Sequence, residues 1–366
     1  DNSIKPPKPG SDLANRGVSG ELWAVHGGGF YNPQKYLVAP KELPAELHWF
    51  KWEAYATWLS GFSMLFIVYY FNASAMMIDK SVADLASWQA IGIGLGTLAL
   101  GWAVYDGLCR SPLGKRDGLL AMVMYGLIVA AAYGLSTVLS GRAAYIHVGA
   151  MIGTMMVGNV LMVIIPGQRK LVDAMQAGKS PDPIYGQRAK QRSVHNNYFT
   201  LPVLFIMISN HYAMTYNHAY NWLVLAAMMA AGVLIRHFFN LKHKGKIAWG
   251  YPAAGVLILL AVAIAIAPKP ANSTATAAGS EEAQFAKVQS IISQRCVACH
   301  SDKPTQAGFA TAPAGILLQT PELVHKNAAK VYQQAVQLKA MPLANLTHIT
   351  EDERATIGAW YLAGAK

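Results

Sequence analysis

Seven long apolar stretches occupy most of residues 52–267, and segments rich in Lys, Arg, Gly and Pro separate them. Each approaches or exceeds the ~18–20 residues that a helix needs to cross about 30 Å of hydrocarbon. Only helices and closed barrels satisfy the backbone in a bilayer, and these stretches are too long for barrel strands. The pattern therefore predicts an all-α, polytopic transmembrane bundle. Its expected helices are Trp52–Phe71, Trp88–Tyr105, Leu119–Leu139, Ala144–Ile165, Phe199–Tyr216, Trp222–Phe239 and Ile247–Ala267.

The flanking segments have a different pattern. Residues 1–51 are polar and turn-rich, and we expect a cytoplasmic N-terminal loop region there. Residues 268–280 resemble a linker, and residues 281–366 have the mixed pattern of a small water-exposed domain. In that domain we expect one helix over about Glu282–Gln294. Thr350 followed by Glu353 forms a capping box, which predicts a second helix over Glu351–Leu362.

Composition and charge support the membrane assignment. Of 366 residues, 53% are hydrophobic and 13% are charged, against about a quarter charged in an average soluble domain. In the loops, eighteen Lys and Arg residues fall on one predicted side, and Lys80 and Arg142 are the two on the other. This asymmetry follows the positive-inside rule, so the net charge of +11 does not indicate nucleic-acid binding. The C-terminal domain is then expected in the periplasm of a bacterial inner membrane.

The sequence Cys296-Val-Ala-Cys299-His300 is the attachment signature of a c-type haem. The two thiols bind the porphyrin covalently, and His300 is close enough to Cys296 in a helical turn to ligate the iron. The alternatives are a chance motif, a disulfide or half of a zinc site. A zinc site needs a second ligand pair, and the remaining cysteine, Cys109, is far away in sequence.

The sixth iron ligand is predicted to be Met341, the single methionine between Glu281 and Lys366. Thioether ligation raises the haem potential and suits electron transfer. His325 and His348 are the competing ligands. A helix, a CxxCH turn, a Met-Pro loop and an aromatic C-terminal helix together resemble a small class I cytochrome c.

Two further groups of polar residues are candidate sites. His147 and His211 lie at similar predicted depth on consecutive helices and could ligate a haem b, or they could donate hydrogen bonds to neighbouring helices. His195, Asn196, Asn197 and Tyr198 are expected to begin a helix at the cytoplasmic face. With His26, Tyr31 and Glu53 they could form a pocket for an anionic ring. The alternatives are an interfacial helix cap and a flexible loop around Gly27–Gly29.

Four segments are specific, namely residues 25–31, 48–55, 195–198 and 209–212. Joined to the C-terminal Cys-x-x-Cys-His segment, they resemble the bacterial membrane-bound urate oxidases, also called urate hydroxylases, with a fused cytochrome c. The resemblance spans the chain and implies oxidation of urate to 5-hydroxyisourate in purine degradation. It further implies electron transfer through haem c to a soluble cytochrome c or a terminal oxidase. Family members carry one more helix before the first seen here, and the chain begins at Asp1, so we expect eight helices in the full protein.

The resulting mechanistic hypothesis places urate near His26 and His195–Tyr198, with a histidine or Glu53 accepting a proton. Two other functions remain open. One is a non-catalytic membrane cytochrome c subunit that serves a separate dehydrogenase. The other is a transporter with an accessory cytochrome, although no clear pair of broken helices is present.

Overall fold

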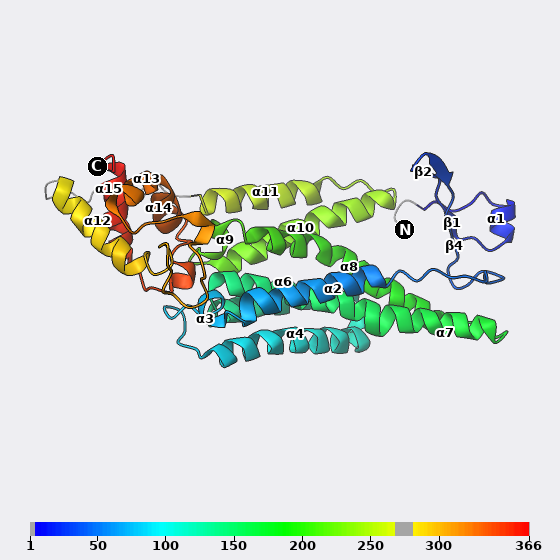
Figure 1. Cartoon of the computed structure of the whole chain (residues 1–366). Helices are drawn as coiled ribbons and strands as arrows, with labels where there is room; N and C mark the ends of the chain where they lie inside the picture. The colour runs from blue at the N-terminus through cyan, green and yellow to red at the C-terminus, as the bar shows by residue number, and fades with distance from the viewer. Residues whose placement is uncertain (1–3, 268–280, 366) are drawn as a thin grey trace. The chain divides into compact units, whose positions relative to one another are not determined.

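The computed structural model describes residues 4–267 and 281–365, so the expected linker at 268–280 lies outside the described residues. The chain forms two compact units, each built from segments that are distant in sequence. Figure 1 labels the helices and strands in chain order. The first unit comprises Asp1–Phe62, Met151–Leu204 and Met229–Ile258, and the second comprises Ser63–Ala150, Phe205–Met228 and Leu259–Lys366.

The N-terminal region of the first unit holds short strands instead of the loop that we expected. After the short helix α1 (Asp12–Asn15), β1 (Gly20–Glu21) pairs antiparallel with β4 (Gln34–Lys35). Between them, β2 (Ala24–His26) pairs with β3 (Gly29–Tyr31). Gly27 and Gly28 have φ values of 58° and 80°, which only glycine adopts readily in succession. The glycines thus form a two-residue hairpin turn, and this explains why the segment is ordered.

Helices are present at all seven predicted apolar stretches. They are α2 (Trp52–Leu65) with the π-helical turn η1 (Phe66–Tyr70), α4 (Ser87–Arg110), α5 (Asp117–Ser136), α6 (Gly141–Gly158) with the π-helical turn η3 (Asn159–Ile164) and α7 (Ile165–Gln176), α8 (Pro183–Ser209), α10 (Asn221–His243) and α11 (Gly250–Ala265). The short α3 (Ala73–Met76), η2 (Pro112–Lys115) and α9 (Ala213–Tyr216) lie in the connections.

Four of these helical spans are long and apolar enough to cross a membrane: Ser87–Arg110, Asp117–Ser136, Gly141–Gln176 and Asn221–His243. The apolar helix α11 is shorter than these four. In α8, polar residues precede the apolar part, and α2 changes to π-helix at Phe66. The helical nature of the predicted bundle is therefore confirmed, and a count of seven spans stays a prediction.

The C-terminal segment of the second unit forms a small helical assembly with its own core. Its elements are α12 (Glu281–Arg295), η4 (Pro313–Gly315), α13 (Pro321–Lys326), α14 (Ala328–Val331), the π-helical turn η5 (Tyr332–Gln337), η6 (Leu343–Asn345) and α15 (Glu351–Leu362). Helix α12 packs against α15, where the rings of Phe285 and Trp360 are 5.7 Å apart (Figure 1). Val288, Ile292, Ile357 and Trp360 are fully buried between the helices.

The predicted capping box is confirmed at the start of α15. The Glu353 backbone N–H donates to the Thr350 hydroxyl at 3.2 Å, and the Thr350 N–H donates to the Glu353 carboxylate at 2.7 Å. The same carboxylate binds the Arg295 guanidinium at the end of α12, with an N–O distance of 3.0 Å. One glutamate thus caps one helix and fastens it to the other.

Candidate functional site

The Cys-x-x-Cys-His segment continues directly from α12. The Cys296 N–H donates to the Ile292 carbonyl at 2.8 Å, and the His300 N–H donates to the Cys296 carbonyl at 2.9 Å. His300 is therefore one helical turn beyond Cys296. Its Nδ1 lies 2.9 Å from the Ile316 carbonyl, an acceptor, so Nδ1 carries the proton and Nε2 keeps its lone pair for a metal.

The two cysteines are not joined to each other or to Cys109. Cys296 packs against the hydrophobic core, and burial raises the pKa of its thiol to about 12. Burial also raises the pKa of the Cys299 thiol, so both groups are protonated at neutral pH. Within residues 4–267 and 281–365, no three His, Cys, Asp or Glu side chains form a metal-binding group. Cys296, Cys299 and His300 therefore fit covalent haem attachment better than a zinc site.

The competing axial ligands have different environments. The His325 ring lies 4.2 Å from the Phe285 ring and 5.6 Å from the Trp360 ring, and its Nδ1 bonds the Ala365 carbonyl. His348 is exposed. Met341 is half-buried, and its backbone is held by hydrogen bonds at both its N–H and its carbonyl. The assignment of Met341 as the sixth ligand stays a prediction.

The structure corrects the predicted helix start at His195. Helix α8 begins at Pro183, so residues 195–198 lie well inside it and their N–H groups are not available to an anion. The residues before His195 are mostly Gln, Arg, Lys and Ala, which favour helix even though they are polar.

The side chains after His195 form hydrogen bonds with other helices of the first unit. Asn196 accepts from the Asn159 side chain at 2.8 Å and donates to the Met156 carbonyl at 3.0 Å. Arg236 and Asn240 donate to the Asn197 side-chain oxygen at 2.8 and 2.9 Å. The Tyr198 hydroxyl lies 2.7 Å from His237 Nδ1. These bonds are typical of polar contacts that hold helices together.

The other residues of the predicted cytoplasmic pocket are exposed. His26 and Tyr31 face each other across the β2–β3 hairpin with ring centroids 6.4 Å apart, and Glu53 lies in the first turn of α2. In the described part of the chain, no hydrogen bond or ring contact joins these three residues to Asn196, Asn197 or Tyr198. Their catalytic and urate-binding roles, and that of His195, stay predictions.

His147 and His211 have dissimilar surroundings. His147 is fully buried; its Nδ1 lies 2.8 Å from the Ala143 carbonyl and its Nε2 lies 3.2 Å from the Tyr70 hydroxyl. A Cβ at Gly94 would lie 2.5 Å from that Nε2, so α4 packs closely against the imidazole. His211 is exposed. The contacts of His147 fit the hydrogen-bonding alternative, and a haem b on His147 and His211 stays a prediction.

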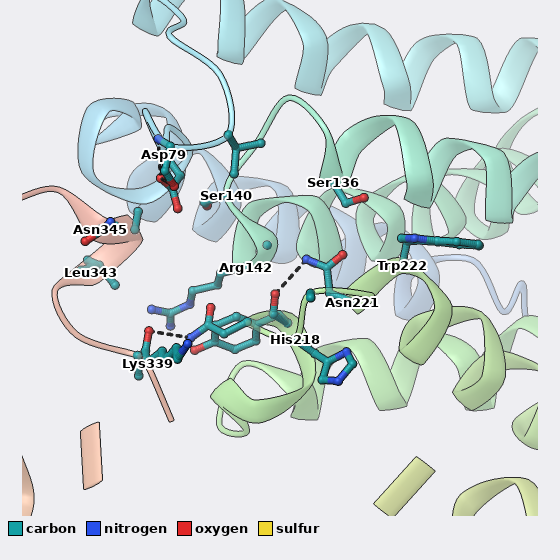
Figure 2. A pocket seen from close by; sticks show the side chains of 18 of the residues that line it. Asp79, Ser136, Ser140, Arg142, His218, Asn221, Trp222, Lys339, Leu343 and Asn345 are labelled. Atoms are coloured by element: carbon teal, nitrogen blue, oxygen red, sulfur yellow. Dashed lines mark hydrogen bonds between the residues drawn. The ribbon is translucent and has the colours of Figure 1, made fainter. Parts of the chain in front are cut away.

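A cavity of about 620 Å³ lies within the second unit, and we name it the Arg142 cavity. Its wall comes from residues 76–82, 133–142, 216–222 and 339–354. Figure 2 shows the Arg142 side chain extending toward the segment that carries Lys339 and Leu343. Sequence reasoning did not assign this site. The one available signal was Arg142 itself, because basic residues are rare on its predicted side of the membrane.

The structure as a whole defines a mostly helical protein in which four helices are suited to a membrane and a C-terminal segment carries a Cys-x-x-Cys-His turn. The family model described as "Urate oxidase N-terminal" matches residues 1–267, which is most of the chain, so the chain belongs to that family. It is a urate-oxidase-related protein, and the family indicates an oxidoreductase that acts on urate. Neither the curated proteins nor the solved structures contain a significant match to it.

Proposed function

We propose that this protein is a membrane-bound urate oxidase that converts urate to 5-hydroxyisourate and transfers the electrons to its own haem c. The single observation that supports the proposal is that a urate oxidase family region and a Cys-x-x-Cys-His motif lie in one polypeptide. Residues 1–267 match the urate oxidase family, and Cys296, Cys299 and His300 follow in the same chain. The protein then lies in a bacterial inner membrane with the cytochrome segment in the periplasm.

The reaction requires an electron acceptor. Urate and one water molecule give 5-hydroxyisourate, two protons and two electrons. A bound haem c supplies a one-electron acceptor, held by thioether bonds to Cys296 and Cys299 and ligated by His300 and Met341. A soluble cytochrome c or a terminal respiratory oxidase is the acceptor beyond it. Each urate therefore reduces two equivalents of a one-electron acceptor.

The test is an anaerobic mixing experiment with the purified full-length holoprotein. Addition of urate should produce the α-band of reduced c-type haem, and dithionite should define full reduction. Two haems should be reduced for each 5-hydroxyisourate formed. If urate gives no reduction while dithionite does, the protein is not the oxidase, and the alternative of a non-catalytic cytochrome subunit that serves a separate dehydrogenase gains support.

A further inference from the structure

Arg142 lies in the second unit with an unusual set of partners. Its side chain is half-buried, and its Nε donates to the Asn210 Oδ1 at 3.3 Å. The same oxygen accepts from the Tyr69 hydroxyl at 3.3 Å. In the described part of the chain, no carboxylate pairs with Arg142. The guanidinium thus contacts Asn210 through its Nε and also interacts with Tyr69, and the Arg142 side chain lines the cavity.

The other charges of the cavity wall are already balanced. Lys339 Nζ lies 2.6 Å from the Glu351 carboxylate, and Arg354 lies 3.7 Å from it. Asp79 accepts hydrogen bonds from the backbone and hydroxyl of Ser81, at 2.9 and 2.5 Å. The wall thus holds three Arg and Lys side chains against two carboxylates. The cation without a carboxylate partner is Arg142, so the cavity favours an anion.

The remaining wall suits a planar ligand. Tyr133, Tyr216 and Trp222 contribute aromatic rings, and the Tyr133 and Trp222 rings meet edge to face at 5.4 Å. Asn217 and Asn221 also line the cavity. Their amide groups already donate to backbone carbonyls, so their side-chain oxygens can accept from ring N–H groups. A volume of about 620 Å³ lies within the usual range for small-molecule sites and exceeds what a bicyclic purine needs.

The cavity also borders the predicted haem loop. Ala340, the residue before Met341, lines it together with Leu343. The Asn217 amide donates to the carbonyls of Leu338 at 3.1 Å and Lys339 at 2.9 Å, which holds this loop against the α9–α10 connection (Figure 2). A ligand in the cavity would be next to the segment that carries the iron ligand.

We propose that the Arg142 cavity is the urate-binding site, with the guanidinium of Arg142 pairing with the anionic edge of the purine. This inference rests on the proposed function. A haem held by Cys296, Cys299 and His300 would accept the two electrons of urate bound here, one at a time, and water would supply the oxygen that bonds to C5 as two protons leave.

The test measures urate binding apart from turnover. Full-length holoprotein in nanodiscs is reduced with dithionite, and labelled urate is added in anaerobic equilibrium dialysis. Arg142→Gln should weaken binding about 10- to 100-fold, because a charge-assisted hydrogen bond is lost. The affinity of Arg142→Lys for urate should lie between those of the native protein and Arg142→Gln, since lysine keeps the charge but lacks the planar guanidinium. Arg110→Gln is the matched control, because Arg110 pairs with Asp106 at 2.6 Å and does not line the cavity.

A second pair of variants leaves Arg142 in place. Thr137 lines the cavity and is exposed, so Thr137→Asp adds a negative charge and Thr137→Asn adds a similar volume without charge. We expect Asp to weaken binding at least fivefold relative to Asn. Near-native affinity in Arg142→Gln, or loss of binding in His195→Ala alone, overturns the inference and leaves the proposed function intact. A native protein that neither binds urate nor is reduced by it overturns both.

Discussion

The guanidinium of Arg354 donates to the Met341 carbonyl, at 2.8 Å from Nη1, and also to the Ala335 carbonyl. Arg354 is 6% exposed and lies on α15, so these bonds fasten the predicted ligand loop to the C-terminal helix. A charged side chain that is this well buried must be satisfied by its partners.

Replacement of Arg354 by Met should therefore destabilise the C-terminal segment by about 2–4 kcal/mol, since two carbonyls lose their donors. The Met341 backbone would also become less constrained. The measurement is the denaturation midpoint together with the methionine-to-iron charge-transfer band of the ferric protein. Lys330→Met is a control, because Lys330 is exposed. Equal stability of the two variants would contradict this account.

Gly94 is required by the contacts of His147. A Cβ there would lie 2.5 Å from His147 Nε2 and 3.1 Å from the Tyr70 hydroxyl, and both of those side chains are buried. Gly94→Ala should cost about 1–3 kcal/mol through overpacking. Gly96, two residues along the same helix, has nothing within 4 Å, so Gly96→Ala should be neutral or stabilising. Thermal unfolding in detergent compares the two, and equal midpoints would count against the packing described here.

Glu353 makes the stability of the C-terminal segment depend on pH. Burial raises its pKa, but the Thr350 backbone N–H and the Arg295 guanidinium outweigh this and hold the pKa below its usual value. A lowered folded-state pKa means that the carboxylate stabilises the fold above the ordinary Glu pKa of about 4.3. This stabilisation is lost as the pH falls through the folded-state pKa.

Glu353→Gln should therefore be less stable than native protein at pH 7, by about 1–2 kcal/mol, and the difference should narrow below about pH 4. Denaturation midpoints across this range measure it. Asp352→Asn is the control, because Asp352 is an exposed neighbour in the same helical turn. A stability difference that stays constant with pH would exclude the titration of Glu353 as its cause.

Measurements of the haem reduction potential and of thermal stability can decide whether Met341 or His325 is the sixth iron ligand. Met341→Ala should lower the haem reduction potential by on the order of 100 mV, because thioether ligation raises it. His325→Ala should leave the potential nearly unchanged and lower stability by about 1–2 kcal/mol through lost ring packing. Spectroelectrochemical titration and thermal unfolding test the pair. A large potential shift in His325→Ala alone would identify the histidine as the ligand.

Local sequence patterns were sufficient to predict individual helices. Helix α15 runs over Glu351–Leu362, as predicted, because Thr350 and Glu353 are three residues apart and decide the helix start by themselves. The apolar stretches predicted helices for the same reason, since their pattern is local. The start of α8 was missed because hydropathy changes at Phe199, whereas helix propensity continues back to Pro183.

The Arg142 cavity could not be predicted in this way. Its wall combines segments that are more than 200 residues apart in sequence, and none of them carries a motif. The bonds of Asn210 and Asn217 that position this wall depend on tertiary packing. Sequence reasoning therefore placed urate beside the polar residues that it could recognise, at Asn196–Tyr198, where the structure shows hydrogen bonds between helices.

Lys339 and Leu343 limit where the chain can be truncated without loss of the Arg142 cavity. They lie after residue 267, yet they line the Arg142 cavity together with residues 76–82, 133–142 and 216–222 of the family-matched portion. A truncated protein ending at residue 267 would lack residues 339–354 of the wall of the Arg142 cavity. An electron carrier added in solution would not replace them. Under the proposed assignment of urate to the Arg142 cavity, joining the two portions in one polypeptide is a condition for substrate binding as well as a means of delivering the proposed electron carrier.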